Sequence, residues 1–299
     1  MTDINAWRKR LGPFGVWAPT DALPIDGAVK AAVLIESLGY SAIWLPETMG
    51  RDPFAHIAHL AGEATSISFA TGIANIHHRH PGAMRQASDT LSEQTGDRFI
   101  LALGVSHAPL VSGLRGLDYS KPVATMRKYL EGVEASPYMA PAPPARAPRL
   151  VGALGPKMVG LSGELADGAH PYWTTPEHTA GAREILGPDK LLCVEQKVVV
   201  TTDATVARDT ARSALSMYAT LPNYRNNWLR LGFTDEDIDS TADHFLDALV
   251  AWGDADTVRA RVEEHITAGA DHVCIQAMTP EHAFTIDEAA LRALAPNPT

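Results

Sequence analysis

Residues 256–276 read DTVRARVEEHITAGADHVCIQ, and this stretch holds one complete copy of the unit from which the chain is built. Val258, Val262 and Ile266 recur every four residues, the spacing of one apolar face of an α-helix. Gly269 follows, where the residue after a helix often needs a positive φ. The apolar run HVCIQ is typical of a strand buried on both faces of a parallel sheet. The stretch therefore predicts a helix, a glycine turn and a buried parallel strand.

The same unit recurs three more times along the chain. It reads VKAAVLIESLGYSAIWL at 29–45, MRQASDTLSEQTGDRFILALG at 84–104 and PKMVGLSGELADGAHPYW at 156–173. The apolar segments that we predict as strands are Phe14–Trp17, Ala42–Leu45, Ile67–Ile73, Phe99–Leu103, Arg149–Gly152, Gly168–Pro171, Leu191–Val200 and His272–Ala277.

Helical patterns separate most of these strands. Alternating strand and helix units in this number, over about 250–300 residues, predict an α/β fold that closes into a (β/α)8 TIM barrel. An open doubly wound sheet is the alternative. Such a sheet usually carries a G-x-G-x-x-G turn after its first strand, whereas this first strand runs into WAPTDALP.

Two segments interrupt the repeat within what we expect to be a single domain over residues 1–299. Residues 136–148, SPYMAPAPPARAP, are rich in proline and alanine and predict an extended surface connection. Residues 222–253 predict a helical insertion, of one or two extra helices, between the seventh and eighth strands. That insertion could cover the barrel mouth or form an oligomer surface.

Composition and charge exclude several classes of partner. The formal net charge of −10 disfavours nucleic acid and anionic membranes, which bind cationic surfaces. The N-terminus lacks the apolar core of a secretory signal, and no run of about 18 apolar residues could span a membrane. Cys193 and Cys274 lie in apolar runs without C-x-x-C spacing. We therefore expect two reduced core cysteines in a cytoplasmic protein.

The active site of such a barrel lies at the C-terminal ends of its strands. The sequence HHRH at 77–80 follows the third strand, so its histidines are candidates for metal ligands or for a loop that faces a ligand. The chain has no H-x-H after the first strand and no H-E-x-x-H, and metal ligands must converge. We therefore predict no metal site.

Two small-residue loops are candidates for binding an anion. GALGPKMVG at 152–160 ends a strand and enters a helix, with Pro156 near its first turn and Lys157 beside it. Free amides at a helix N-terminus, together with a lysine, can hold a phosphate, although the same pattern also fits a plain tight turn. ALGVSHAPL at 102–110 follows the neighbouring strand. Together the loops suggest a phosphate-bearing cofactor.

Several segments resemble the luciferase-like monooxygenase superfamily, and within it the coenzyme F420-dependent oxidoreductases of actinobacteria. They span nearly the whole chain, and the block from the third to the fourth strand is the most diagnostic. The resembling segments are YSAIWLPE (40–47), FATGIANIHHRHP (69–81), ASDTLSEQTGDRFILALGVS (87–106), GALGPKMVGLSGELADG (152–168) and WGDADTVRARVEEHITAGADHVCIQ (252–276).

The resemblance implies a barrel, usually dimeric, that holds a flavin or deazaflavin at its C-terminal mouth. The ring would pack on a bulge with a non-proline cis peptide, by position Gly72–Ile73, and the phosphate would bind at Gly104–Ser106 and Gly152–Lys157. The cofactor-binding residues expected on this basis are Trp17, Thr71, Gly72, Ile73, Ala74, Gly104, Val105, Ser106, Gly152, Ala153, Leu154, Gly155, Pro156 and Lys157.

One departure from the family concerns proton transfer. Many members carry an acidic residue followed by histidine after the second strand, whereas this chain has Glu47 followed by Thr48. Any acid would therefore come from Glu47, His78 or His107. The residues that we expect to shape the substrate pocket are His77, Arg79, Tyr172 and Trp173.

These observations lead to an expected function with two alternatives. The leading hypothesis is an F420-dependent oxidoreductase, a cytoplasmic homodimer that moves a hydride between the deazaflavin and a small organic substrate. The first alternative is an FMN-dependent monooxygenase of the same superfamily. The second is a barrel that binds the cofactor without catalysis.

Overall fold

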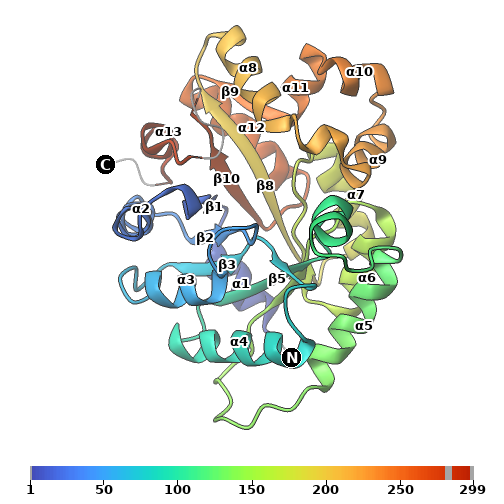
Figure 1. Ribbon diagram of the computed structural model, residues 1–299. Helices are drawn as coiled ribbons and strands as arrows, with labels where there is room; N and C mark the ends of the chain where they lie inside the picture. Colours follow the sequence, from blue (N-terminus) through green and yellow to red (C-terminus); the bar gives the residue numbers. More distant parts are fainter. Residues whose placement is uncertain (1, 280–284, 297–299) are drawn as a thin grey trace.

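Parallel strands close into a barrel in the structure, a computed structural model that describes residues 2–279 and 285–296 (Figure 1). Strand β8 pairs with β10, which pairs with β1, and these contacts complete the ring. The barrel strands in their order round the ring are β1 (Phe14–Trp17), β2 (Ala42–Leu45), β3 (Ser68–Thr71), β5 (Phe99–Gly104), β6 (Arg149–Val151), β7 (Gly168–Ala169), β8 (Leu191–Val200) and β10 (His272–Ala277). The predicted (β/α)8 barrel is confirmed.

Strand boundaries differ from prediction where loops enter the site. The predicted third strand, Ile67–Ile73, is shorter in the structure, where β3 ends at Thr71. A bulge at Gly72 and Ile73 follows, and the two-residue β4 (Ala74–Asn75) then pairs with β5. Strand β7 covers only two of its four predicted residues. After it the chain leaves the ladder and lines a cavity instead.

Helices surround the barrel, and many of them begin with proline (Figure 1). Proline suits the first helical turn because its missing N–H would have no partner there. The helices that begin with proline are α3 (Pro53–Leu60), α4 (Pro81–Gln94), α5 (Pro122–Ala135), α6 (Pro156–Leu165), α7 (Pro176–Leu186) and α9 (Pro222–Arg230). The other helices outside the insertion are α1 (Ile4–Leu11), α2 (Ile25–Ser37), α8 (Ala204–Leu215), α12 (Ala255–Thr267) and α13 (Glu288–Ala293).

The core has separate apolar clusters inside and outside the strands. The outer cluster lies between the strands and their helices. The inner cluster includes Trp44 and the two cysteines, both of which are buried and unpaired. Trp7 and Leu11 of α1 belong to this inner cluster, and α1 leads directly into β1. Helix α1 therefore closes the N-terminal end of the barrel and leaves the opposite end for a site.

The insertion at 222–253 is larger than the one or two helices expected. It contains α9, α10 (Asp235–Ser240) and α11 (Asp243–Leu249), and it ends in the strand β9 (Val250–Gly253). Strand β9 pairs in parallel with the last residues of β8, from Lys197 to Val200. Strand β7 pairs only with Leu191 and Leu192 of the ten-residue β8, so the end of that edge of β8 is free to accept β9.

Two remaining predictions concern the surface. Residues 136–148 contain neither helix nor strand, as expected for an extended connection. Within the part of the chain that the structure describes, no helix has the length and apolar content needed to cross a bilayer.

Candidate functional site

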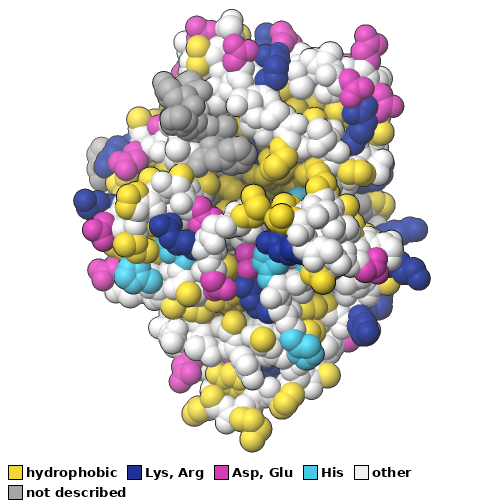
Figure 2. All heavy atoms as spheres, viewed as in Figure 1, with side chains coloured by type: hydrophobic (Ala, Val, Ile, Leu, Met, Phe, Trp, Pro, Cys, Tyr) yellow, Lys and Arg dark blue, Asp and Glu magenta, His cyan; other side chains and the backbone are white. Residues whose placement is uncertain are grey.

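A cavity of about 380 Å³ opens at the C-terminal ends of the barrel strands. Its volume lies within the range of small-molecule sites. Figure 2 shows hydrophobic side chains gathered across the middle of this face, with charged and histidine side chains around them. Among the described residues, those lining the cavity include Asp21 and Glu47 but no lysine or arginine.

Many of the predicted site residues meet at this cavity. Those that line it are Trp17, Glu47, Gly72, Ile73, Gly104, Val105, Ser106, His107, Gly152, Ala153, Leu154 and Tyr172. Others lie near it without lining it, in the described part of the chain: Thr71, Ala74, His77, His78, Arg79, Gly155, Pro156, Lys157 and Trp173.

The bulge after β3 forms the floor of the cavity. The Gly72–Ile73 peptide is cis, as the resemblance implied. The Trp17 indole Nε1 donates a 2.9 Å hydrogen bond to the carbonyl oxygen of Gly72. A Cβ atom at Gly72 would lie 3.0 Å from that indole nitrogen, so glycine allows the close contact.

The Ile73 side chain gives a physical reason for two of the glycines. A Cβ at Gly104 would lie 2.5 Å from Ile73 Cδ1, and a Cβ at Gly152 would lie 3.3 Å from Ile73 Cγ2. The space beside both glycines is therefore taken by Ile73. Both glycines also line the cavity, and the phosphate position that the resemblance implied beside them stays a prediction.

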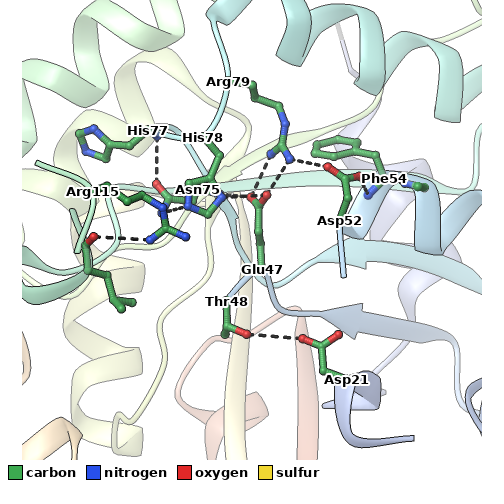
Figure 3. Close-up of polar contacts among 12 residues, drawn as sticks. Asp21, Glu47, Thr48, Asp52, Phe54, Asn75, His77, His78, Arg79 and Arg115 are labelled. Atoms are coloured by element: carbon green, nitrogen blue, oxygen red, sulfur yellow. Dashed lines mark hydrogen bonds and ion pairs between the residues drawn. The ribbon is translucent and has the colours of Figure 1, made fainter. Parts of the chain in front are cut away.

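The loop HHRH at 77–80 is folded around the carboxylate of Glu47 (Figure 3). Arg79 donates two hydrogen bonds to it, of 2.9 and 2.6 Å, and the backbone N–H of Asn75 donates a third of 2.6 Å. His78 Nδ1 lies 3.0 Å from the same carboxylate. Bidentate arginine–carboxylate contacts fix geometry as well as charge, so Glu47 anchors the loop to β2.

The remaining histidines of the loop also have local roles. The His77 backbone N–H donates to Asn75 Oδ1 at 2.9 Å, and His80 Nδ1 accepts from the N–H of Gly82 to cap α4. Throughout residues 2–279 and 285–296, no three His, Cys, Asp or Glu side chains form a group that could hold a metal. The polar contacts of the loop are therefore made with Glu47, Asn75 and the first turn of α4.

Replacing Glu47 by glutamine is expected to lower the free energy of unfolding by about 2 kcal/mol, because charge-assisted hydrogen bonds from Arg79 are lost. Urea unfolding measures this. Asp52→Asn is the matched control, since Asp52 also contacts Arg79 at 2.7 Å but its side chain is 51% exposed. The control is expected to change stability by less than about 1 kcal/mol. Equal losses in both variants would contradict the anchoring role.

His107 is the predicted catalytic histidine that lines the cavity. Its ring packs 5.5 Å from the Tyr224 ring, measured between centroids. Burial lowers the pKa of His107, and a hydrogen bond with Asn223 partly offsets that effect. The ring is therefore neutral near pH 7, and neutral imidazole is suited to accepting a proton.

An aromatic wall with a buried cation behind it closes one side of the cavity. The Tyr172 hydroxyl donates a 3.0 Å hydrogen bond to Gln276 Oε1. Lys197 Nζ lies 3.6 Å from the Tyr172 ring centroid and 3.8 Å from that of Trp173. The same ammonium is 3.0 Å from Glu195 Oε1, and both side chains are 1% exposed. Burial lowers the pKa of Lys197 to about 8 and raises that of Glu195.

Sequence reasoning missed several lining residues. The most informative are Asp21, Leu110, Tyr218, Asn223 and Tyr224. His170 directly follows β7 and also lines the cavity, as the rule that strand ends form the site predicts, although no role was assigned to it from the sequence. Tyr218 and Tyr224 belong to the region after β8, whose course over the barrel depends on tertiary packing and has no local sequence signal.

The candidate phosphate loop lies at the edge of the cavity. Helix α6 begins at Pro156, and its N-cap residue, Gly155, has no side chain with which to cap the free amides. A Cβ at Gly155 would lie 3.4 Å from Arg230 Nη2 of α9. The α6 N-terminus therefore has two cations nearby, Lys157 in its own first turn and Arg230 from the insertion. This arrangement fits an anionic group.

Comparison with known proteins gives the family. The family model for luciferase-like monooxygenases matches residues 12–272. The chain belongs to this family. Membership also confirms the prediction of an oxidoreductase of the luciferase-like type.

Similar proteins divide between two cofactors. A Mycobacterium tuberculosis protein named as a coenzyme F420-dependent oxidoreductase is 25% identical, over 89% of this chain and 94% of its own. An F420-dependent secondary alcohol dehydrogenase, solved with an F420-acetone adduct, has a TM-score of 0.75 at 15% identity, covering 95% of this chain and 99% of its own. A type II Baeyer-Villiger monooxygenase from Pseudomonas putida, solved with FMN, has a TM-score of 0.69 at 16% identity, covering 95% and 98%. At these identities the solved structures show the fold alone.

Proposed function

We propose that this luciferase-like protein is an F420-dependent oxidoreductase that transfers a hydride between the deazaflavin and a small organic substrate. The observation that carries the proposal is the match, over nearly the full length of both chains, to the M. tuberculosis protein named for F420. A 5,10-methylenetetrahydromethanopterin reductase of Methanolobus tindarius, 28% identical over 52% of each chain, is a further relative.

The described residues fit such a cofactor in three respects. The cavity has a volume of about 380 Å³, and Ile73 contributes an apolar side chain to its lining. The uncapped N-terminus of α6, with Lys157 and Arg230, would hold the phosphate. The bound deazaflavin would supply the hydride-transferring carbon, while the protein positions the substrate and excludes water.

Proton transfer would need a neutral side chain of the protein that can accept a proton. Glu47 is occupied by Arg79 and His78, whereas His107 lines the cavity and is neutral near pH 7. We propose that His107 accepts the hydroxyl proton when an alcohol is oxidised, and returns it in the reverse direction. A homodimer in the cytoplasm remains part of the proposal.

The FMN-dependent monooxygenase is the second candidate, because the structural likeness to the FMN-bound monooxygenase is also high. Titration of the purified protein with F420 and with FMN distinguishes the two. Binding of F420 with turnover of a carbonyl or alcohol panel supports the proposal. Tight binding of FMN with oxygen consumption supports the alternative, and binding without any turnover indicates the non-catalytic barrel.

Lys157→Ala is expected to weaken F420 binding about tenfold, because it removes a charge-assisted contact to the phosphate. Fluorescence titration with F420 measures the dissociation constant. Lys30→Ala on α2 is the control, since Lys30 is also exposed but belongs to a helix whose residues do not line the cavity in the described structure. An affinity that Lys157→Ala leaves unchanged would contradict the phosphate position.

A further inference from the structure

Two buried histidines contact Trp44, a fully buried residue of β2. The His170 ring stacks on the Trp44 ring, with centroids 4.4 Å apart and an interplanar angle of 13°. The His272 ring lies 5.8 Å from it at 29°. Neither histidine is more than 2% exposed. Because the two share burial and a neighbour, the contacts of their ring nitrogens can be compared directly.

Both ring nitrogens of His272 have partners. Nδ1 lies 3.0 Å from the carbonyl oxygen of Gly12, which can only accept, so Nδ1 carries the proton. The Trp44 indole Nε1 then donates to His272 Nε2 at 3.1 Å. Burial lowers the pKa of His272 to about 4, so the ring is neutral and its hydrogen bonding is complete.

His170 has the same proton arrangement with one partner fewer. Its Nδ1 lies 2.9 Å from the carbonyl oxygen of Cys193 and therefore carries the proton. Burial lowers the pKa of His170 to about 4, which leaves a lone pair on Nε2 at neutral pH. Nε2 is buried and has no hydrogen-bond partner among the residues that the structure describes. An unpaired buried acceptor is unfavourable and calls for a donor.

The position of His170 indicates where that donor comes from. His170 lines the cavity, whereas His272 is absent from the lining residues of the described chain. The carbonyl of Cys193 and the face of Trp44 together fix the ring, so Nε2 cannot exchange roles with Nδ1 without breaking the bond to Cys193. His170 therefore places a fixed acceptor, without a partner among the described residues, in the wall of the cavity that a bound molecule would occupy.

We propose that His170 Nε2 is the hydrogen-bond acceptor for an N–H or O–H group of the molecule bound in the cavity. The donor is either the imide N–H of the deazaflavin ring or the hydroxyl of an alcohol substrate, which present the same chemistry to the nitrogen. The inference rests on the proposed function and adds a positioning residue to it.

Two substitutions of His170 separate its ring nitrogens. Asparagine keeps a polar atom near Nδ1 and removes Nε2, whereas glutamine extends a polar atom toward the Nε2 position. If the cofactor is the donor, His170→Asn weakens F420 binding about tenfold, the effect of leaving one buried donor unpaired. If the substrate is the donor, F420 binding is unchanged and the KM for the alcohol rises by about the same factor. His170→Gln is expected to recover most of either loss.

His272→Gln is the matched control, because it changes a histidine of equal burial that contacts the same tryptophan. It is expected to lower the unfolding midpoint while leaving the F420 dissociation constant and the KM within about twofold, since His272 is already satisfied within the protein. Wild-type protein labelled with ¹⁵N-histidine gives a readout that does not depend on variant folding. The His170 Nε2 resonance is expected to move when F420 or the alcohol is added.

The two levels of the proposal fail differently. A wild-type protein that does not bind F420 contradicts the proposed function. Wild-type binding and turnover that His170→Asn leaves unchanged, with a static Nε2 resonance, contradict the acceptor role alone.

Discussion

Replacing Glu195 by alanine is expected to lower the free energy of unfolding by about 3–5 kcal/mol, the cost of leaving a buried charge without its partner. Glu195 and Lys197 form a 3.0 Å ion pair on β8, and each side chain is only 1% exposed. The truncation leaves the Lys197 ammonium facing the rings of Tyr172 and Trp173 without a carboxylate. Tyr172 lines the cavity, so the wall of the site is expected to loosen as well.

The double variant Glu195→Leu/Lys197→Met provides the control. Replacing both members of a buried ion pair by apolar side chains of similar volume is often neutral or stabilising. Burial lowers the pKa of Lys197 and raises that of Glu195, so the loss of solvation exceeds the attraction for both groups. The free energy of unfolding of the double variant is therefore expected to lie within about 1 kcal/mol of the wild-type value, or above it. A double variant as unstable as Glu195→Ala would contradict this account of the pair.

Stability is expected to fall by several kcal/mol between pH 7 and pH 5, because three buried histidines resist protonation. Burial lowers the pKa of His170 and His272 to about 4 and that of His265 to about 3. In the unfolded chain each has an ordinary pKa of about 6.5. Between these values the unfolded state binds more protons than the folded state, so stability decreases as the pH falls.

The expected slope of the free energy of unfolding against pH depends on how many histidines are held neutral in the folded state. Each histidine contributes about 1.4 kcal/mol per pH unit once its unfolded form is protonated. Carboxylates whose pKa is lowered in the folded state, such as Glu36, Glu134 and Asp247, stay ionised in both states above pH 5, so they add little there. Glu195 has the opposite effect on stability. Burial raises its pKa in the folded state, so the folded state binds this proton more readily and a fall in pH favours folding through this group.

Urea unfolding at pH 7, 6 and 5 measures this dependence. His265→Asn provides the internal test, since His265 bonds to Thr179 Oγ1 and Gln196 Oε1 and does not line the cavity among the described residues. The variant is expected to be less stable at pH 7 but to show a slope smaller by about one proton. A wild-type stability that is flat from pH 7 to pH 5 would contradict the neutral state assigned to these histidines.

The features predicted correctly are those that local pattern controls. Glycine after an apolar helical stripe, followed by a continuous apolar run, marked β10, and the same pattern marked β2 and β5. These signals are strong because strands of a parallel barrel are buried on both faces. The cis peptide bond between Gly72 and Ile73 was predicted from the family resemblance, because nothing in the local sequence identifies it.

The features that were missed depend on contacts between distant segments. The group that lies against Gly104 is Ile73, which is 31 residues earlier in the chain and meets it only across the strands. Likewise the sequence leaves Glu47 as a candidate free acid, whereas in the structure its carboxylate accepts two hydrogen bonds from Arg79. His170 belongs to no recognisable motif, and its significance lies in Nε2, which has no hydrogen-bond partner within residues 2–279 and 285–296.

The measurement that tests the central claim most directly is a titration of the purified apo protein with F420 and FMN in parallel, followed by fluorescence and by the shift in unfolding temperature. Saturable F420 binding that stabilises the fold, and that weakens in Lys157→Ala, is the predicted result. Binding of FMN in preference to F420, or no effect of either molecule, would contradict the claim that this barrel holds a deazaflavin between Ile73 and the N-terminus of α6.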